Sequence, residues 1–204
     1  MEFKNKILNV FDAVSTFYYC LMSGVPYNKS WKVKGRLHVI RRAWLTALLF
    51  GKKSGSLVIG DGFRCNNSID SNEVGIIQPC VFNIYQENCI IEIGNNVGIS
   101  GSTLSAVDRI TIGDNVLIGS GCLITDNDSH ALEWEKRKTK RREYIKHAPI
   151  LISDNAFIGA RCIILKGVTV GKGSVIGAGS VVSKDVPDNC VVCGNPAQIV
   201  KRLK

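Results

Sequence analysis

Histidine is the side chain best suited to moving a proton here, and the 204 residues include three of them. A neutral imidazole has a pKa of about 6.5, so it can act as a general base at physiological pH. His130 and His147 share one charged segment, whereas His38 lies in the strand-like stretch VKGRLHVI. A neighbouring acid could hold one tautomer of the imidazole ring. Three acidic residues stand within four positions of His130: Asp126, Asp128 and Glu133.

Cysteine usage gives no metal or redox signature. The eight cysteines include one C-x-x-C pair, Cys190 and Cys193, and no second pair or nearby histidine completes a zinc site. We interpret the cysteines as small buried residues in a reducing compartment, so we expect a cytoplasmic protein that requires no metal.

The net charge of +9 is concentrated in two places. Residues 1–53 carry ten Lys and Arg against two acids, and residues 133–147 carry seven against three. The remainder sums to −3, so the body of the protein lacks the basic face that a nucleic-acid groove needs. We therefore expect no nucleic acid as a partner.

The elements that must position these side chains follow from a repeat of six residues. Aliphatic side chains recur without a miss at every sixth position: Ile152, Ile158, Ile164, Val170, Ile176 and Val182. Three more precede a break: Ile112, Ile118 and Ile124. A helix has a period of 3.6 residues and a hairpin strand a period of two, so neither produces this spacing. Six residues can form one short strand and one tight turn.

Three such units close a triangular coil of about eighteen residues, whose aliphatic side chains stack inside the tube. Asn-rich pairs such as Asn95–Asn96 and Asp154–Asn155 fit the turns, where unusual backbone angles are needed. The sequence predicts an all-β solenoid over residues 57–187. An N-terminal arm and irregular first coil would occupy 1–56, with an apolar insertion at 43–50, and a C-terminal tail would occupy 188–204.

The N-terminal arm contains an amphipathic pattern at residues 7–22. Its apolar side chains fall on one helical stripe: Ile7, Val10, Phe11, Val14, Phe17, Tyr18 and Leu21. The run is too short and too interrupted to span a membrane. We expect this helix to pack on its own domain, or else to contact the inner face of a membrane peripherally.

The stretch from ISDNAFIGARC to GAGSVVSKDVP and GNPA resembles the hexapeptide-repeat acyltransferases, in the branch of galactoside, maltose and polysaccharide O-acetyltransferases. The resemblance implies a left-handed parallel β-helix, a homotrimer with active sites between subunits, and acetyl-coenzyme A as donor. It also implies a sugar or glycan acceptor, such as a surface or capsular polysaccharide or its precursor. Lys166 departs from the family, which usually has Pro before Gly167.

The repeat is interrupted at residues 125–151, and long loops in regular solenoids are usually functional or disordered. The segment ITDNDSH resembles the place where this family keeps its catalytic histidine, so we expect His130 to be the general base. We rank Asp128 first as the residue that orients it. Alternatively, Asp128 and Asp126 occupy turns or bind acceptor hydroxyls. We expect structural roles for His147 and His38.

Donor and acceptor residues are likewise implied by the resemblance. Small residues at Ala160, Gly177–Ala178 and Ser183 match positions where backbone contacts pantetheine, although tight corners alone would also require small residues. Lys184 and Lys201 match positions that meet coenzyme phosphates. Ser102 is our candidate for acceptor contact.

The basic run at 136–142 is either a solvated loop or a surface that attracts an anionic ligand. Other functions remain open on the same scaffold. The acceptor could be an amino sugar, an antibiotic or serine. A zinc carbonic anhydrase would need a different histidine spacing, and a structural or ice-binding solenoid would not need the charged interruption.

Overall fold

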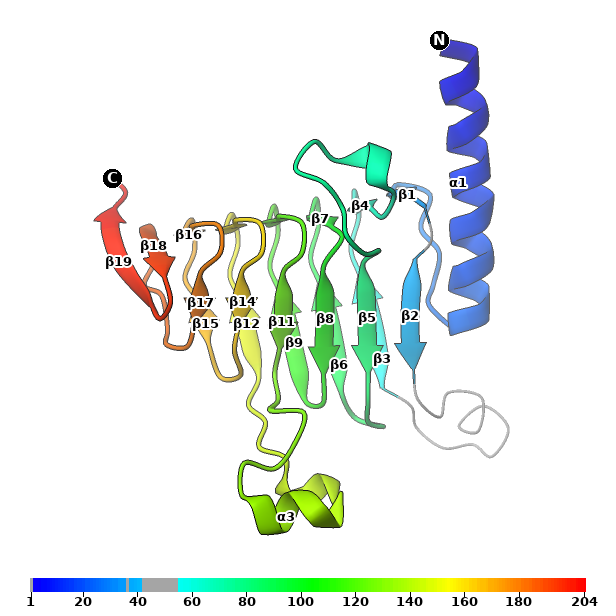
Figure 1. Ribbon diagram of the computed structural model, residues 1–204. Helices are drawn as coiled ribbons and strands as arrows, with labels where there is room; N and C mark the ends of the chain where they lie inside the picture. Colours follow the sequence, from blue (N-terminus) through cyan, green and yellow to red (C-terminus); the bar gives the residue numbers. More distant parts are fainter. Residues whose placement is uncertain (1, 36, 42–54) are drawn as a thin grey trace.

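The computed structural model describes residues 2–35, 37–41 and 55–204, so the apolar insertion expected at 43–50 lies outside the described residues. The chain forms a left-handed parallel β-helix with an N-terminal helix at one end and a loop protruding from one side (Figure 1). This is the architecture that the sequence predicts.

Three parallel sheets form the faces of the prism. The first sheet contains β1 (Lys32–Lys34), β4 (Arg64–Asn66), β7 (Gly98–Ser100), β10 (Leu117–Ile118), β13 (Phe157–Ile158), β16 (Val175–Ile176), β18 (Cys190–Gly194) and the antiparallel β19 (Ala197–Arg202). The second contains β2 (His38–Arg41), β5 (Val81–Ile84), β8 (Thr103–Ala106), β11 (Leu123–Thr125), β14 (Ile163–Ile164) and β17 (Val181–Val182). The third contains β3 (Ser56–Ile59), β6 (Ile90–Ile93), β9 (Arg109–Ile112), β12 (Ile150–Ile152) and β15 (Thr169–Val170).

The aliphatic repeat forms the core of this prism. Ile152 pairs in register with Ile112 on one side and with Val170 on the other. All three side chains are essentially inaccessible to solvent. Residues one coil apart therefore stack along the axis, which removes their apolar surface from water. Seven of the eight cysteines are also buried and all are free, as expected for small interior side chains.

Asparagines form a second ladder along the turns. Asn115 and Asn155 both have a positive φ, of 57° and 60°, a conformation that asparagine tolerates better than most residues. The side-chain amide of Asn96 donates to Asn115, and that of Asn115 donates to Asn155, at 3.3 and 3.2 Å. The turns expected from the Asn-rich pairs are therefore confirmed, and they are linked from coil to coil.

Helix α1 (Glu2–Ser23) packs differently from our expectation. Thr16 and Cys20 are buried, and the Asp12 side chain accepts a hydrogen bond from the backbone of Gly35. The apolar stripe from Val10 to Leu21 instead faces solvent, with exposed fractions of 52–69% for its described side chains. The helix therefore packs on its own domain, as expected, but through Thr16 and Cys20 and not through the apolar stripe, because helical periodicity identifies an apolar face without identifying what covers it. Within the described part of the chain, no helix is long and apolar enough to cross a membrane, and peripheral membrane contact stays a prediction.

The interruption of the repeat forms a loop with a closed neck. It leaves the prism after β11 and returns at β12, and it contains α3 (Trp134–Thr139) and the 3₁₀ turn η2 (Arg142–Tyr144). Asn127 and His147 form an antiparallel bridge across its base. The backbone of Asp128 donates to Lys146 at 3.1 Å, and that of Ala148 donates to Asp126 at 2.9 Å. The neck therefore fixes both ends of the loop at the corner between the second and third sheets, which we call the loop corner.

Candidate active site

Asp126 anchors the neck from inside the protein. Its side chain is fully buried, and its carboxylate accepts hydrogen bonds from the backbone of Val107 and Asp108, at 2.9 and 2.7 Å, and from the Asn127 amide at 3.0 Å. Burial raises the pKa of the Asp126 carboxyl, and these hydrogen bonds oppose the rise. The structure thus places Asp126 as the link between the turn after β8 and the loop, away from the cavity surface.

Asp128 pairs with a residue to which the sequence assigns no role. Its Oδ1 lies 2.5 Å from Nζ of Lys166, which follows β14 at the same corner. Its Oδ2 is buried without a hydrogen-bond partner among the described residues. The carboxylate of Asp128 therefore contacts Lys166 in the single chain, while one of its oxygen atoms still has a free acceptor position.

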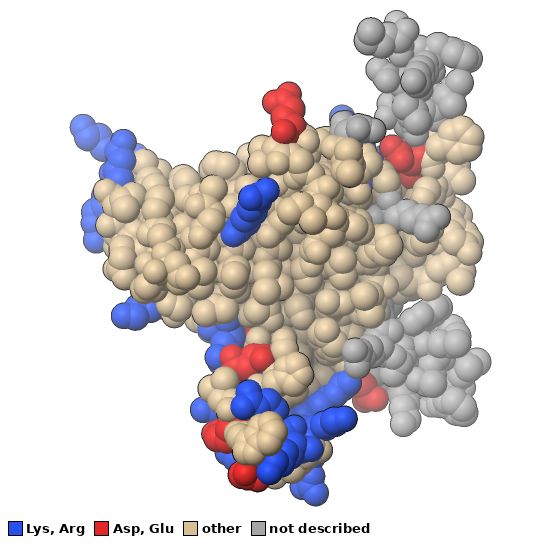
Figure 2. All heavy atoms as spheres, viewed as in Figure 1, with Lys and Arg blue, Asp and Glu red and all other residues tan. Residues whose placement is uncertain are grey.

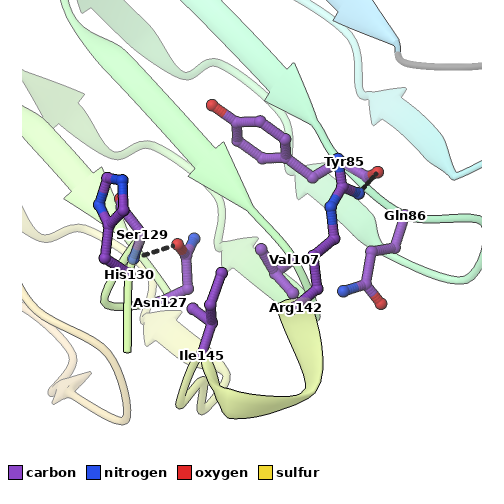
Figure 3. A pocket seen from close by; sticks show the side chains of 8 residues that line it. All are labelled: Tyr85, Gln86, Val107, Asn127, Ser129, His130, Arg142 and Ile145. Carbon is purple, nitrogen blue, oxygen red and sulfur yellow. Dashed lines mark hydrogen bonds between the residues drawn. The ribbon is translucent and has the colours of Figure 1, made fainter. Parts of the chain in front are cut away.

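A backbone hydrogen bond holds His130 in place. The backbone N–H of His130 donates to the carbonyl of Asp128 at 2.6 Å, and Ser129 between them adopts a positive φ of 60°. The N–H of Ser129 donates to the Asn127 side chain at 2.9 Å. This tight turn carries the exposed imidazole of His130 away from the neck, as Figure 3 shows.

A cavity of about 320 Å³ opens beside this imidazole at the loop corner. We call it the corner cavity, and its lining residues are labelled in Figure 3: Tyr85, Gln86, Val107, Asn127, Ser129, His130, Arg142 and Ile145. Arg142 Nη1 lies 3.4 Å from the carbonyl oxygen of Tyr85, which joins the loop to the turn after β5. Two successive coils, through the turns after β5 and β8, and the loop therefore contribute to one concave surface with an exposed imidazole at its edge.

Ser102 does not reach this cavity in the single chain. It is fully buried between β7 and β8, at the corner between the first and second sheets. Its hydroxyl lies 2.8 Å from the carbonyl of Gly119 and accepts the N–H of Cys122 at 2.9 Å. These contacts tie adjacent coils together, and acceptor contact by Ser102 stays a prediction.

The candidate donor residues are divided between different parts of the chain. Ala160 lies between β13 and β14, and Gly177–Ala178 between β16 and β17, so both stand at the corner between the first and second sheets. We call this the donor corner. Ser183 and Lys184 follow β17 near the loop corner, and Lys201 lies in β19; all three are exposed. The structure therefore does not bring His130 and Ala160 together within one chain.

Stacking explains part of the small-residue pattern at the donor corner. A Cβ atom on Gly159 would lie 2.6 Å from the backbone nitrogen of Ala178, and one on Gly177 would lie 2.3 Å from Sγ of Cys193. Close coil packing therefore requires glycine at position 159, where the neighbour is backbone, whereas at position 177 the Cys193 side chain would have to rotate. A Cβ on Gly179 would meet nothing within 4 Å, so the backbone beside Ala178 is open to a ligand.

The other histidines lie outside the corner cavity. Nδ1 of His147 is 3.4 Å from the Asp108 carboxylate, at the base of the neck. His38 lies in β2, one of the first strands of the prism. Among the described residues, no three His, Cys, Asp or Glu side chains are grouped so that they could hold a metal ion.

Sequence reasoning missed Tyr85, Gln86 and Lys166. The coil register contains the signal that could have found Lys166. Ile124 pairs with Ile164, so the residue two positions after Ile164 stands at the coil edge next to Asp126 and the loop neck. Tyr85 is harder to find, because the coils before residue 112 are longer than eighteen residues, as the pairing of Ile93 with Ile112 shows.

A family model described as the hexapeptide repeat of succinyl-transferase matches residues 109–125 and 149–184. The galactoside O-acetyltransferase of Lactococcus lactis is 36% identical over 169 residues, which cover 76% of this chain and 80% of that protein. The galactoside O-acetyltransferase of Escherichia coli is 38% identical over 129 residues, which cover 62% of this chain and 60% of the relative's length.

The structural comparison agrees with the sequence comparison. The crystal structure of a hexapeptide-repeat acetyltransferase of Vibrio cholerae, complexed with acetyl-coenzyme A, matches with a TM-score of 0.53 at 30% identity. The match covers 80% of this chain and 76% of that one.

Proposed function

The chain belongs to the hexapeptide-repeat acetyltransferase family that includes the galactoside O-acetyltransferases, and on that basis we propose that it transfers the acetyl group of acetyl-coenzyme A to a sugar hydroxyl. The observation that carries the proposal is the exposed imidazole of His130, held by a tight turn at the edge of the corner cavity. The acceptor would be a surface or capsular polysaccharide or its precursor, since an exposed base can meet a bulky glycan.

In this mechanism His130 removes the proton from the acceptor hydroxyl as its oxygen attacks the thioester carbonyl. A carbon–oxygen bond forms, the carbon–sulfur bond breaks, and the imidazolium returns the proton to the departing thiolate. Asp128 contributes through its backbone carbonyl, which accepts the backbone N–H of His130 and so helps to orient this residue.

We also propose that the working enzyme is a homotrimer with composite sites. The loop corner with His130 and the donor corner with Ala160 and Ala178 are different edges of one prism. A three-fold arrangement brings the loop corner of one subunit against the donor corner of the next. The open backbone beside Ala178 and the exposed Lys184 and Lys201 are suited to pantetheine and to coenzyme phosphates.

Substitution of the base tests the proposal. His130→Ala should lower kcat for thiol release from acetyl-coenzyme A, with a panel of sugars as acceptors, by about 10²–10⁴-fold. Coenzyme binding should be retained, because the donor residues are unchanged. His147→Ala is the matched control, since His147 lies in the same loop and outside the corner cavity. Unchanged turnover in His130→Ala would contradict the assignment of His130 as the general base.

A further inference from the structure

His130 borders two cavities. The second, which we call the basic cavity, has a volume of about 340 Å³. It shares Ser129, His130, Arg142 and Ile145 with the corner cavity. A molecule whose hydroxyl meets His130 can therefore extend into the basic cavity without leaving the loop.

The basic cavity is lined by cations. Five of its lining side chains are positively charged: Lys136, Arg137, Lys140, Arg141 and Arg142. Among the described residues that line it, there is no acid. Figure 2 shows the same feature from outside, where Lys and Arg gather on the protruding loop and few charges mark the visible face of the coils.

The acids of the loop do not neutralise this cavity. Each pairs with one cation at 3.3–3.4 Å: Glu133 with Lys136, Glu135 with Lys138, and Glu143 with Arg141. These pairs are highly exposed, and such pairs hold their partners only weakly. Arg137, Lys140 and Arg142 have no acidic partner within the described part of the chain. The cavity therefore keeps a net positive charge beside the base.

The geometry of α3 directs particular cations into the cavity. Lys136, Arg137 and Lys140 line it, whereas Lys138 lies outside the lining and its Nζ is 3.3 Å from the Glu135 carboxylate. Lys140 ends the helix with a positive φ of 54°. The positions of these residues around the helix therefore place three cations in the cavity lining and leave Lys138 outside it.

We propose that the basic cavity binds an anionic group of the acceptor, a phosphate or a carboxylate, so that the enzyme acetylates a charged glycan or a phosphate-linked precursor in preference to a neutral sugar. Guanidinium and ammonium groups form charge-assisted hydrogen bonds with these anions, and arginine can bind them with two parallel bonds. The anion would anchor the acceptor beside His130 and bring its hydroxyl to the imidazole. This inference rests on the proposed function.

Two double variants of equal charge test the site. Arg137→Gln with Lys140→Gln removes two cavity cations, and Lys138→Gln with Lys146→Gln removes two cations of the same loop that do not line the cavity. Binding of inorganic pyrophosphate, glucose 1-phosphate, glucuronic acid and glucose is measured by calorimetry without coenzyme. The phosphate and uronate probes separate the two sources of the anion, and glucose is the neutral reference.

We expect the cavity variant to weaken binding of the preferred anionic probe by about tenfold, the equivalent of about 1.4 kcal/mol, and the control variant to change it little. The value of kcat/KM for an acceptor bearing that anion should fall in parallel, with a neutral acceptor unaffected. Equal losses in both variants, or no loss in either, would overturn the inference. So would a rise only in the KM of acetyl-coenzyme A, because the cations would then serve coenzyme phosphates.

Failure of the proposed function would give a different result. Probe binding requires no turnover, so it can be measured in His130→Ala as well. If no acceptor is acetylated but the cavity variant alone loses probe binding, the anion site stands and the assignment of acetyl transfer fails.

Discussion

The carboxylate of Asp126 joins two segments that are eighteen residues apart, the turn at Val107–Asp108 and the loop neck. Asparagine could not replace it fully. An amide oxygen at the Oδ2 position could still accept both backbone N–H groups, but the NH₂ at the Oδ1 position would face the amide donor of Asn127. Asp126→Asn should lower the free energy of unfolding by about 1–3 kcal/mol at pH 7, measured by urea denaturation.

The same variant should also change how stability depends on pH. Because burial raises the folded-state pKa of Asp126 above its unfolded value of about 3.9, the folded state binds the proton more tightly. The contribution of Asp126 to stability therefore rises as pH falls through the folded-state pKa toward the unfolded one. The difference between wild type and Asp126→Asn should be larger near the unfolded-state pKa, at about pH 4, than at pH 7, and equal differences would contradict this explanation.

Individual residues also show the limits of reading this site from sequence. The sequence singles out His130 because its segment resembles a family motif, and the structure places this residue at the edge of the corner cavity, while its role as the base stays a prediction. The pairing of Asp128 with Lys166 was missed, since 38 residues and a whole loop separate them. Finding it required continuing the coil register across the interruption, from Ile124 to Ile164.

Among the elements, the turns as well as the strands are linked from coil to coil by hydrogen bonds. Asn155 combines a positive φ of 60° with a hydrogen bond from Asn115. Asn155→Ala should destabilise the fold by about 1–2 kcal/mol, because a Cβ-bearing residue without a side-chain amide is disfavoured in this conformation. Asn155→Gly keeps the backbone freedom and should cost less, so calorimetric melting of the two variants separates backbone strain from the lost hydrogen bond. Equal losses in the two variants would show that the amide ladder dominates, since both variants lack the amide.

The regular and irregular elements differ in how far the sequence predicts them. Strands β12 to β17 follow from the six-residue spacing, since Ile158 and Ile176 are eighteen residues apart and pair in register. Helix α1 was expected from its apolar stripe, but the face through which it packs was not, because Thr16 and Cys20 rather than the aromatic side chains face the prism. A periodic pattern specifies contacts within an element, whereas packing also depends on the partner surface.

At the scale of the whole molecule, the proposed composite site can be tested by complementation. His130→Ala removes the base, and Ala178→Trp fills the open backbone at the donor corner. Each pure variant should be inactive. A trimer assembled from equal amounts of both should recover about a quarter of wild-type activity, because a random interface joins the two intact halves one time in four. No recovery in mixed trimers of verified mass would contradict a site shared between subunits.

The closed neck of the loop has a further consequence for how such enzymes diversify. Its backbone hydrogen bonds, from Asp128 to Lys146 and from Ala148 to Asp126, close the base of the loop without a contribution from the residues between them. The segment between them can change length and composition while the stacked aliphatic ladder keeps its spacing. Evolution could thus change the acceptor preference by replacing this one loop, while the coils that bind the coenzyme remain unchanged.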